Sequence, residues 1–569
     1  MCIRDRYHKY GILVGIMHIH RVKSKQRSKV YEQVLLRESY REPGAPRSAV
    51  KKRTLLNLTQ YPPQEVKAIE LALKHKNDLP KLEKLLDGKI RQKQGRSVGA
   101  VWVLWQLCRN IGLGHVLGRS KNALLCLWMV LARLIDQGSR LSAARLAKDH
   151  AACEILGLSD FDENDLYKAL DWLAGAQDRI EKHFFKQKYG NEKPRLFLYD
   201  VTSSYLEGEQ NELGDWGYNR DKKRGKKQIV VGLLCDDEGE PVSIRVFKGN
   251  TSDIKTFASQ IEKTAQEFGC QRVTMVGDRG MIKSSQIEDL GRAGFSYITA
   301  ITKPQIKAMI KEGVFQLGLF DEKICEVEHH GVRYILRRNP IRAAEMAESR
   351  AERIGKLQAL AEEQTQYLAT HPRADRHKAW QKVVEKEGRF KLGSLVTVTA
   401  EDRWVKVEVD EEYLAEIAEL DGCYALKTDL PVEAASKETL HARYKDLAEV
   451  ESAFRNMKTG HLEMRPIFVR KTERTRAHAF IVMLAYLLRL KLEAAWRDFD
   501  ITVEEGLKQL STLCAMENQI GGKAGFLSVP APRDSLARLF TALEIEPPTT
   551  LPRRIARVDT KQKLPTRRK

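Results

Sequence analysis

The sequence lacks several short patterns by which common protein classes are identified. None of its nine cysteines forms a CxxC pair with another, which argues against a zinc ribbon and against a secreted disulfide scaffold. No GxxxxGK motif is present, so nothing supports an ATP-driven mechanism. The strongest apolar stretch, residues 477 to 490, contains His478 and Arg489 and is shorter than the roughly 18 to 20 residues of a membrane span. These absences favour a cytoplasmic protein without a membrane anchor.

Positive charge is abundant instead. The 569 residues include 97 Lys and Arg against 76 Asp and Glu, a formal net charge of +21. Such a balance favours a polyanionic partner, with nucleic acid first and an anionic membrane surface second. The alternative is a basic protein that binds no polyanion.

Changes of pattern along the chain predict about three or four folded units and a tail. The first six residues resemble a translated sequencing adaptor, so we exclude them and expect the natural start later, with Met17 a candidate. The predicted parts are a strand-rich basic region (7–95), a helical DNA-binding region (96–190), an α/β core (191–302 and 431–500), an insertion (303–430) and a C-terminal region with a basic tail (501–569).

The predicted core has a recognisable order of elements. Three apolar strands come first, and helices then alternate with two more strands, which is typical of a mixed α/β sheet with right-handed crossovers. The ribonuclease-H-like fold has this order, and its first and fourth strands are neighbours. The predicted strands are 196–202, 229–235, 242–247, 273–277 and 295–301, and the predicted helices are 253–268 and 284–292.

Two aspartates lie on apolar strands of this predicted sheet. Asp200 shares a face of its strand with Leu196 and Leu198, where a lone carboxylate is costly to bury unless it is paired or metal-bound. Asp278 follows the stretch 273–277, at the strand end where ligands and metals gather in α/β sheets. Because their strands are predicted neighbours, we expect the two carboxylates to face each other. The alternative for each is an aspartate that caps a turn or helix.

A glutamate near the C-terminal end of the core completes the set. We predict one amphipathic helix from 440 to 458, with Glu451 in the middle of its apolar face. The other residues on that face are Tyr444, Leu447, Phe454 and Lys458. We interpret Glu451 as a third metal ligand, and the alternative is a glutamate paired with an arginine at the core edge. Three such carboxylates would hold two divalent ions about 3.5 to 4 Å apart.

These residues resemble a known family. The stretch Tyr444-x2-Leu447-x3-Glu451-x6-Lys458 resembles the Tyr-x2-Arg-x3-Glu-x6-Lys signature of bacterial insertion-sequence transposases of the DDE class, with Leu447 in place of the arginine. Residues 200–203 (Asp-Val-Thr-Ser) and 277–280 (Gly-Asp-Arg-Gly) are similar to the motifs around that family's first and second catalytic aspartates. The resemblance covers roughly residues 194 to 490, including the large insertion before the catalytic helix.

The resemblance implies a role for each matching residue. Asp200, Asp278 and Glu451 would be catalytic and would bind Mg²⁺ or Mn²⁺, while Tyr444 and Lys458 would contact phosphates of the transposon end. It also implies a ribonuclease-H-like core, a homodimer on double-stranded DNA that carries the terminal inverted repeats, a target DNA, and a place in the bacterial nucleoid.

The predicted loop 219–227 joins the first two strands and is strongly basic. It holds Arg220, Lys222, Lys223 and Arg224, which we predict to grip the DNA backbone, although a solvated basic loop explains them equally well. Trp216 and Tyr218 nearby could stack on an exposed base or could anchor the loop.

The function that follows is transposition by direct transesterification. Water first attacks a phosphodiester at the element's end, and the freed 3′-hydroxyl then attacks another strand, without a covalent enzyme intermediate. Two alternatives stay open from the sequence: a ribonuclease-H-like nuclease without strand transfer, and a DNA-binding protein that has lost catalysis.

Overall fold

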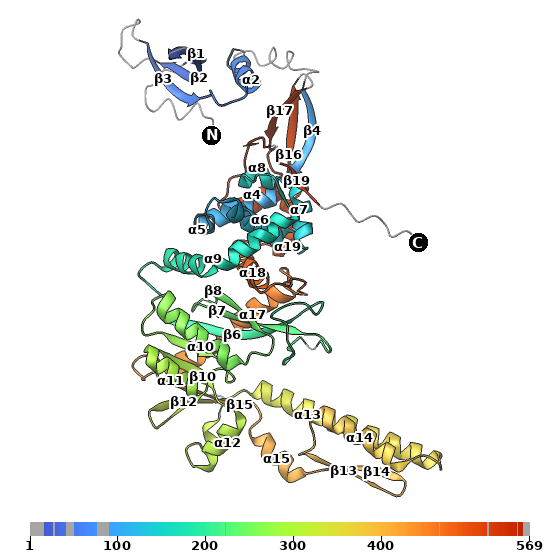
Figure 1. The fold of residues 1–569 in the computed structure, drawn as a ribbon. Coiled ribbons are helices and arrows are strands. Elements are labelled where there is room, and N and C mark those ends of the chain that lie inside the picture. The colour runs from blue at the N-terminus through green and yellow to red at the C-terminus, as the bar shows by residue number, and fades with distance from the viewer. Residues whose placement is uncertain are drawn as a thin grey trace. The chain divides into compact units, whose positions relative to one another are not determined.

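The computed structural model describes the fold of most of the chain (Figure 1), which divides into two compact units. The described residues are 16–26, 29–40, 50–74, 76, 90–221, 223–321, 323–465, 467–520, 523–554 and 556–560. The suspected adaptor segment, the end of the basic tail and Lys222 lie outside them. One unit combines residues 1–169 with 488–569, and the other is 170–487. The finer five-part division stays a prediction. Within the described residues, no helix combines the length and apolarity needed to cross a bilayer.

The N-terminal strands form a three-stranded antiparallel sheet. Its order is β1 (Ile16–Gln26), β2 (Lys29–Tyr40) and β3 (Lys51–Asn57), followed by α2 (Pro63–Lys74). The strand-rich character predicted for the N-terminal region is therefore confirmed. Pro63 opens α2, at a helix position where the missing backbone N–H is not needed.

The rest of this unit is helical, with a four-stranded antiparallel sheet ordered β18-β17-β16-β4. Its strands are β4 (Ile90–Ser97), β16 (Cys514–Ile520), β17 (Lys523–Ser528) and β18 (Thr550–Leu551), while β5 (Phe161–Asp162) pairs with β19 (Val558–Asp559). The helices are α4 (Gly99–Asn110), α5 (Leu113–Leu117), α6 (Lys121–Ile135), α7 (Arg140–Asp149), α8 (Ala152–Leu156), α19 (Val503–Leu510) and α20 (Asp534–Ala542). The apolar pattern of residues 64–188 predicts helices throughout, and this prediction is wrong at β4, because its partner β16 lies more than 400 residues away.

The second unit is built on an eight-stranded sheet in the order β11-β12-β15-β10-β9-β6-β7-β8. The strands are β6 (Leu196–Tyr205), β7 (Gln228–Cys235), β8 (Pro241–Lys248), β9 (Thr274–Gly277), β10 (Ser296–Ala300), β11 (Cys325–His329), β12 (Val332–Arg338) and β15 (Cys423–Thr428). The β6–β9 and β9–β10 pairs are parallel, and the others are antiparallel. The α/β class and the predicted order, with the first and fourth strands as neighbours, are confirmed.

Helices cover both faces of this sheet. On one face, Phe197 and Tyr199 of β6 pack with Phe257 of α10 (Asp253–Glu262) and Leu290 of α11 (Ser284–Ala293) in one buried cluster. Side chains alternate along a strand, so Asp200 projects to the opposite face. There α17 (Leu447–Lys458) packs against β6. The long helices α9 (Glu163–Tyr189) and α18 (Thr472–Ala495) contain the points where the chain passes between units.

The helix predicted at 253–268 does not run to its end as an α-helix. After α10 the backbone widens into a π-helical turn, Lys263–Glu267, where the Phe268 N–H donates to the Lys263 carbonyl at 3.1 Å. The wider turn accompanies burial of Lys263, whose ammonium pairs with Glu181 of α9.

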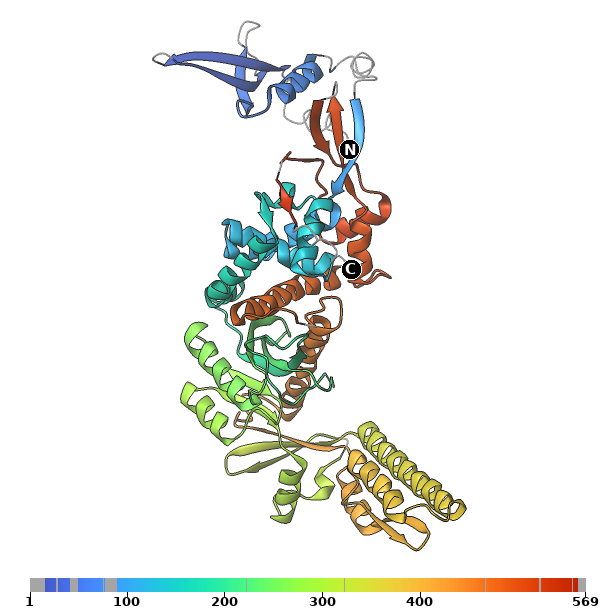
Figure 2. The ribbon, with the colours of Figure 1, turned by 45° about the vertical axis from the view of Figure 1, so that its right-hand side comes forward.

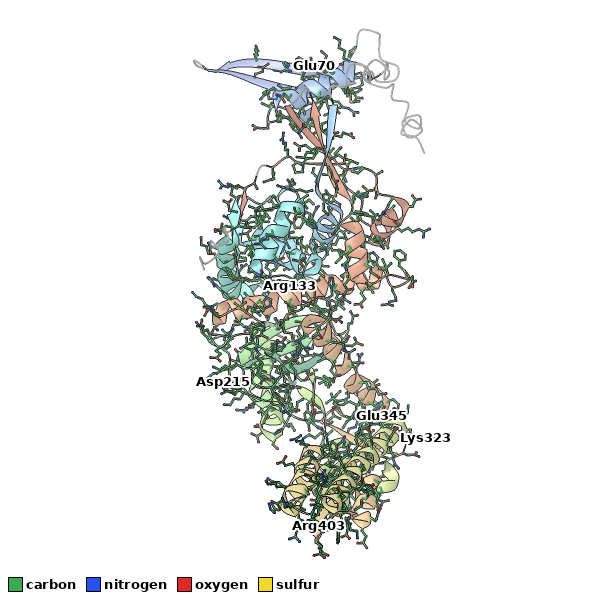
Figure 3. The ribbon with its side chains drawn as sticks, turned by 90° about the vertical axis from the view of Figure 1, so that its right-hand side faces the viewer. Glu70, Arg133, Asp215, Lys323, Glu345 and Arg403 are labelled. Atoms are coloured by element: carbon green, nitrogen blue, oxygen red, sulfur yellow. The ribbon has the colours of Figure 1, made fainter. Side chains whose placement is uncertain are left out.

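Residues 303–430, predicted as an insertion, contribute to two structures. The strands β11, β12 and β15 extend the core sheet, together with α12 (Lys303–Lys311) and a 3-10 turn, Leu317–Leu319. The remainder has its own hydrophobic cluster, in which α13 packs against α14 and the β-hairpin (Figure 2). Its elements are α13 (Pro340–Thr370), α14 (Arg376–Phe390), β13 (Val396–Glu401), β14 (Trp404–Val409) and α15 (Glu411–Glu419). Arg403 at the hairpin turn (Figure 3) donates to the His371 carbonyl at 2.6 Å, just beyond the end of α13.

The helix predicted at 440–458 is two helices, so that prediction is wrong. α16 (Lys437–Lys445) and α17 meet at Asp446, where the Glu449 N–H donates to the Asp446 carbonyl only three residues back at 2.9 Å. Aspartate is a weak helix-interior residue and a good helix-terminal one. The Asp446 carboxylate also pairs with Arg443 at 3.2 Å. The break lets the two helices take independent directions on the sheet.

Gly232 of β7 leaves room for a neighbouring ring. A Cβ added there would lie 2.1 Å from the hydroxyl oxygen of Tyr199 on β6. We expect Gly232→Ala to lower the free energy of unfolding by about 2 kcal/mol, because overpacking a filled core forces side chains off their rotamers. Urea unfolding of the full-length protein measures this.

Gly175→Ala is the matched control, because an added Cβ there has no neighbour within 4 Å. Gly175 lies inside α9, so alanine should stabilise by about 1 kcal/mol. If both variants shift stability in the same direction, steric contact with Tyr199 does not explain the role of Gly232.

Candidate active site

The register of the sheet brings the two predicted aspartates to the same level. In the parallel pair β6–β9, Tyr199 is opposite Gly277, and the next residues along the two strands are Asp200 and Asp278. Asp278 is exposed just past the end of β9, and its carboxylate accepts the Arg279 N–H at 2.8 Å. The expectation that the two carboxylates face the same region rests on this register.

Asp200 has an unusual titration. Its side chain is largely buried, which raises its pKa to about 7. The Val201 N–H and the Arg220 guanidinium oppose that rise, whereas the carboxylates of Asp278 and Glu451 add to it. The charges of Asp278 and Glu451 therefore both act on the carboxyl group of Asp200. A raised pKa from burial and like charges is characteristic of functional sites.

The two helices after the insertion bring a tyrosine and a glutamate to this region. Burial and the nearby Asp278 raise the pKa of the half-buried Tyr444, at the end of α16, and Asp200 and Glu451 add to the effect. Glu451 itself is exposed, so its predicted position in the middle of the apolar face is wrong. The buried side of α17 consists of Val450, Ala453, Phe454, Met457 and Lys458. Glu451 stands at the edge of that side, where its carboxylate can meet solvent or a ligand.

The Lys458 side chain is buried inside the unit. It is 8% exposed, and its ammonium donates to the Thr202 hydroxyl at 2.9 Å and to the Asp221 carboxylate at 2.5 Å. Burial lowers its pKa, although the hydrogen bond that it donates to Asp221 opposes the change. The phosphate contact that the resemblance implies for Lys458 stays a prediction, and in this structure the ammonium is bound to two oxygens of the unit itself.

The basic loop between β6 and β7 lies beside the carboxylates. Arg220 donates from its backbone to Ser203 at 2.8 Å and from its guanidinium to Asp253 at 2.9 Å, and its charge acts on Asp200. Lys223 and Arg224 are exposed, and Lys222 lies outside the described residues. Asp215, labelled in Figure 3, pairs with Gln228 through both backbone groups and closes the loop at its base.

The aromatic residues of the loop are among the most exposed in the described part of the chain. Tyr218 is 82% exposed and Trp216 is 59% exposed. The Arg220 guanidinium lies 6.0 Å from the Tyr218 ring centre, at the edge of cation–π range. Such exposure does not fit the alternative that these rings anchor the loop by burial.

Two residues of the site were not predicted from the sequence. Asp221 binds Lys458 and also pairs with Arg465, which follows α17. A sequence signal for Asp221 existed, since it is the only acidic residue in the basic run 219–227. No such signal marks Arg465, because its distance from Asp221 depends on the path of the chain after α17.

The chemistry of the three carboxylates fits a divalent metal ion. Carboxylate oxygens are hard ligands of the kind that Mg²⁺ and Mn²⁺ prefer. The repulsion that Asp278 and Glu451 exert on Asp200 would be relieved by a cation among them. Across the described residues, however, no three His, Cys, Asp or Glu side chains are already arranged closely enough to hold an ion. The three carboxylates thus suit a divalent ion by their charge and ligand type, although their side chains are not yet arranged around one position.

Comparisons with known proteins found two matching family models. The family model described as transposase DDE domain matches residues 191–488, and the IS1634 family transposase N-terminal domain matches residues 19–82. No curated protein matches the chain. A cryo-EM structure of a piggyBac transposase synaptic complex with hairpin DNA is similar over 68% of this chain and 70% of that chain, with 8% identity and a TM-score of 0.34.

The first match covers more than half of the chain and includes the whole of the eight-stranded sheet. The second covers α2 and the three-stranded sheet except for the first three residues of β1. The resemblance found in the sequence motifs, over roughly residues 194 to 490, is thus confirmed, and the N-terminal match adds a region in which no motif was identified. The protein is a DNA transposase and belongs to the family that carries the DDE domain.

Proposed function

We propose that Asp200, Asp278 and Glu451 are the catalytic carboxylates of this transposase. The observation that carries the proposal is the register of β6 against β9, which brings Asp200 and Asp278 to one level, with α17 and its Glu451 packed on β6. Residues separated by up to 251 positions act on one carboxyl group, on the face of the sheet where α17 packs. Members of the family cleave and join DNA strands, and this cluster is the part of the chain whose chemistry suits that reaction.

The reaction is a pair of phosphoryl transfers. Water attacks the phosphorus at an element end and the 3′ oxygen leaves with the electron pair of the broken bond. The freed 3′-hydroxyl then attacks a second phosphodiester, so one P–O bond replaces another and no ATP is consumed. Divalent ions, Mg²⁺ or Mn²⁺, held by the three carboxylates would supply the positive charge that favours a hydroxide nucleophile and a leaving oxyanion.

The surrounding residues hold the DNA. The Tyr444 hydroxyl, kept protonated by burial and by the acidic cluster, donates a hydrogen bond to a phosphate oxygen. Arg220, Lys223 and Arg224 contact the backbone of double-stranded DNA, and we extend this proposal to Lys222 on its sequence position alone. Two copies of the chain hold the two ends with their terminal inverted repeats, as the family resemblance implies.

The DNA contacts of the basic loop make a quantitative prediction. The double variant Lys223→Gln/Arg224→Gln should weaken DNA binding and lower the slope of log affinity against log salt by about 2, because each phosphate contact releases about 0.9 counterions. Binding to a labelled duplex at several salt concentrations, in EDTA, measures this. Lys378→Gln/Lys382→Gln, two exposed lysines of α14, removes the same charge elsewhere. An equal fall in both double variants would show that net charge, not the loop, determines binding.

The experiment that tests the function is an end-cleavage assay with product analysis. Linear DNA with the element's own ends is incubated with protein and Mg²⁺, Mn²⁺ or EDTA, and the strands are resolved on denaturing gels. We expect metal-dependent breaks at the ends followed by joined products. Breaks without any joined strand would favour the nuclease alternative. Binding without breaks in either metal would favour a protein that has lost catalysis.

A further inference from the structure

A single carboxylate connects the basic loop, the first catalytic strand and the catalytic helix. The Asp221 side chain is 2% exposed. One of its oxygens pairs with Lys458 at 2.5 Å and also with Arg465, and the other accepts the Tyr205 N–H at 3.0 Å. Its backbone N–H donates to Asn219 at 2.9 Å. A buried carboxylate with this many partners is held in one position.

Its partner Lys458 ties α17 to β6 and so fixes the position of the helix along that strand. Lys458 follows Glu451 by seven residues, or about two helical turns, so both side chains lie on the same side of the helix. On β6, Thr202 follows Asp200 by two residues and projects from the same face. The hydrogen bond from Lys458 to Thr202, at 2.9 Å, therefore fixes the position of Glu451 along the strand that carries Asp200.

We propose that Asp221 is a positioning residue of the active site, which holds Lys458 and Arg465 so that Glu451 stays in register with Asp200. Lys458 acts inside the protein in this arrangement and does not contact DNA. The inference rests on the proposed function, because it assumes that Glu451 and Asp200 act together. It assigns Asp221 no contact with the substrate.

The proposal predicts that substituting Asp221 and substituting Lys458 differ in effect, because the two substitutions leave different charges unpaired. Asp221 neutralises two cations, so Asp221→Asn leaves both the Lys458 ammonium and the Arg465 guanidinium without their anion. Lys458→Met removes one cation, and Asp221 keeps Arg465 as a partner. Breaking a buried pair is most harmful when an uncompensated charge remains. The asparagine variant should therefore be the more damaging of the two.

The test compares Asp221→Asn and Lys458→Met with a matched control. Asp421→Asn serves as the control, because Asp421 is also buried and pairs with two cations, Arg350 at 2.6 Å and Lys303 at 3.7 Å. Each protein is assayed for thermal unfolding, for end cleavage over a range of Mg²⁺ concentrations, and for DNA affinity against salt in EDTA. Glu451→Gln is run beside them, so that failure of the catalytic assignment is seen separately.

We expect Asp221→Asn to cut about 100-fold more slowly than the folded control variant, as a displacement near 1 Å can produce. Its Mg²⁺ requirement should rise about 10-fold, as when a supporting residue of a metal ligand is lost. Lys458→Met should show a smaller fall in rate and an unchanged salt slope. A purely structural role would move stability without changing the Mg²⁺ requirement.

Two results would overturn the proposal. One is a folded Asp221→Asn protein with the Mg²⁺ requirement and rate of the control. The other is a salt slope lowered by about 1 in Lys458→Met, which would place its ammonium on a phosphate. If Asp221→Asn does not fold, Lys458→Met decides: slower cutting with the slope intact supports the inference. Normal cutting by Glu451→Gln would instead refute the catalytic assignment on which it rests.

Discussion

Glu451→Gln is expected to reduce the rate of end cleavage by at least about 1000-fold while leaving DNA binding intact. Glutamine keeps the shape of the side chain and removes the negative charge that a divalent ion needs. Because Glu451 is exposed at the edge of the buried side of α17, the substitution should leave packing and stability unchanged. Single-turnover cleavage with Mg²⁺ measures the rate, and binding in EDTA measures the affinity.

Glu449→Gln provides the control for this substitution. Glu449 is also exposed on α17, two residues earlier, so the two variants differ in which side of the helix loses its charge. It should cut at nearly the wild-type rate. Equal cutting by wild type and Glu451→Gln would exclude Glu451 as a ligand, and equal loss in both variants would point to the total charge of the helix.

Asp200→Asn is expected to stabilise the metal-free protein, and to do so more strongly at high pH. The pKa of Asp200 is about 7 in the folded protein and 3.8 in its reference state, so the folded state binds the proton more tightly. The wild-type protein therefore loses stability as pH rises from about 4 to about 7. We expect the gain from asparagine to be about 2.5 kcal/mol larger at pH 8 than at pH 5. The same variant should be inactive in cleavage.

Urea unfolding of the full-length protein in EDTA at the two pH values tests this prediction. Asp237→Asn, an exposed aspartate after β7, should change stability by no more than about 0.5 kcal/mol at either pH. A gain at Asp200 that does not depend on pH would indicate relief of crowding and not of charge. A loss of stability at pH 8 would show that the carboxylate is favourably paired.

Much of the catalytic unit could be predicted because its signals are local. The succession of short apolar strands and helices gives the sheet order. Because the first and fourth strands are neighbours in that order, Asp200 and Asp278 are predicted to lie close together. The strand predictions at 229–235 and 242–247 agree with β7 and β8 for the same reason. Periodicity within one element and the rules of chain crossover were enough.

The features that were missed depend on partners distant in sequence. β4 contains five charged or amide side chains, a glycine and a serine but only one apolar residue, and it is a strand because β16 pairs with it. Lys458 matches a signature whose lysine is expected to contact DNA, yet its ammonium is bound internally by Asp221, 237 residues away. The helix break at Asp446 was also missed, because the prediction treated residues 440–458 as one straight helix. Tertiary contacts override the local pattern in each case.

The pairing of β4 with β16 has a consequence for synthesis of the protein on the ribosome. The chain makes β4 first, then the whole of residues 170–487, and only afterwards the strand that completes the sheet. Domains fold as they emerge, at about 5 to 20 residues per second, so β4 waits roughly 20 to 80 s for its partner. Glu451 likewise emerges long after Asp200 and Asp278. A ribosome-bound or truncated chain ending before Glu451 would thus carry the early DNA-contacting elements without the complete set of carboxylates, and cutting would begin only once translation is nearly finished.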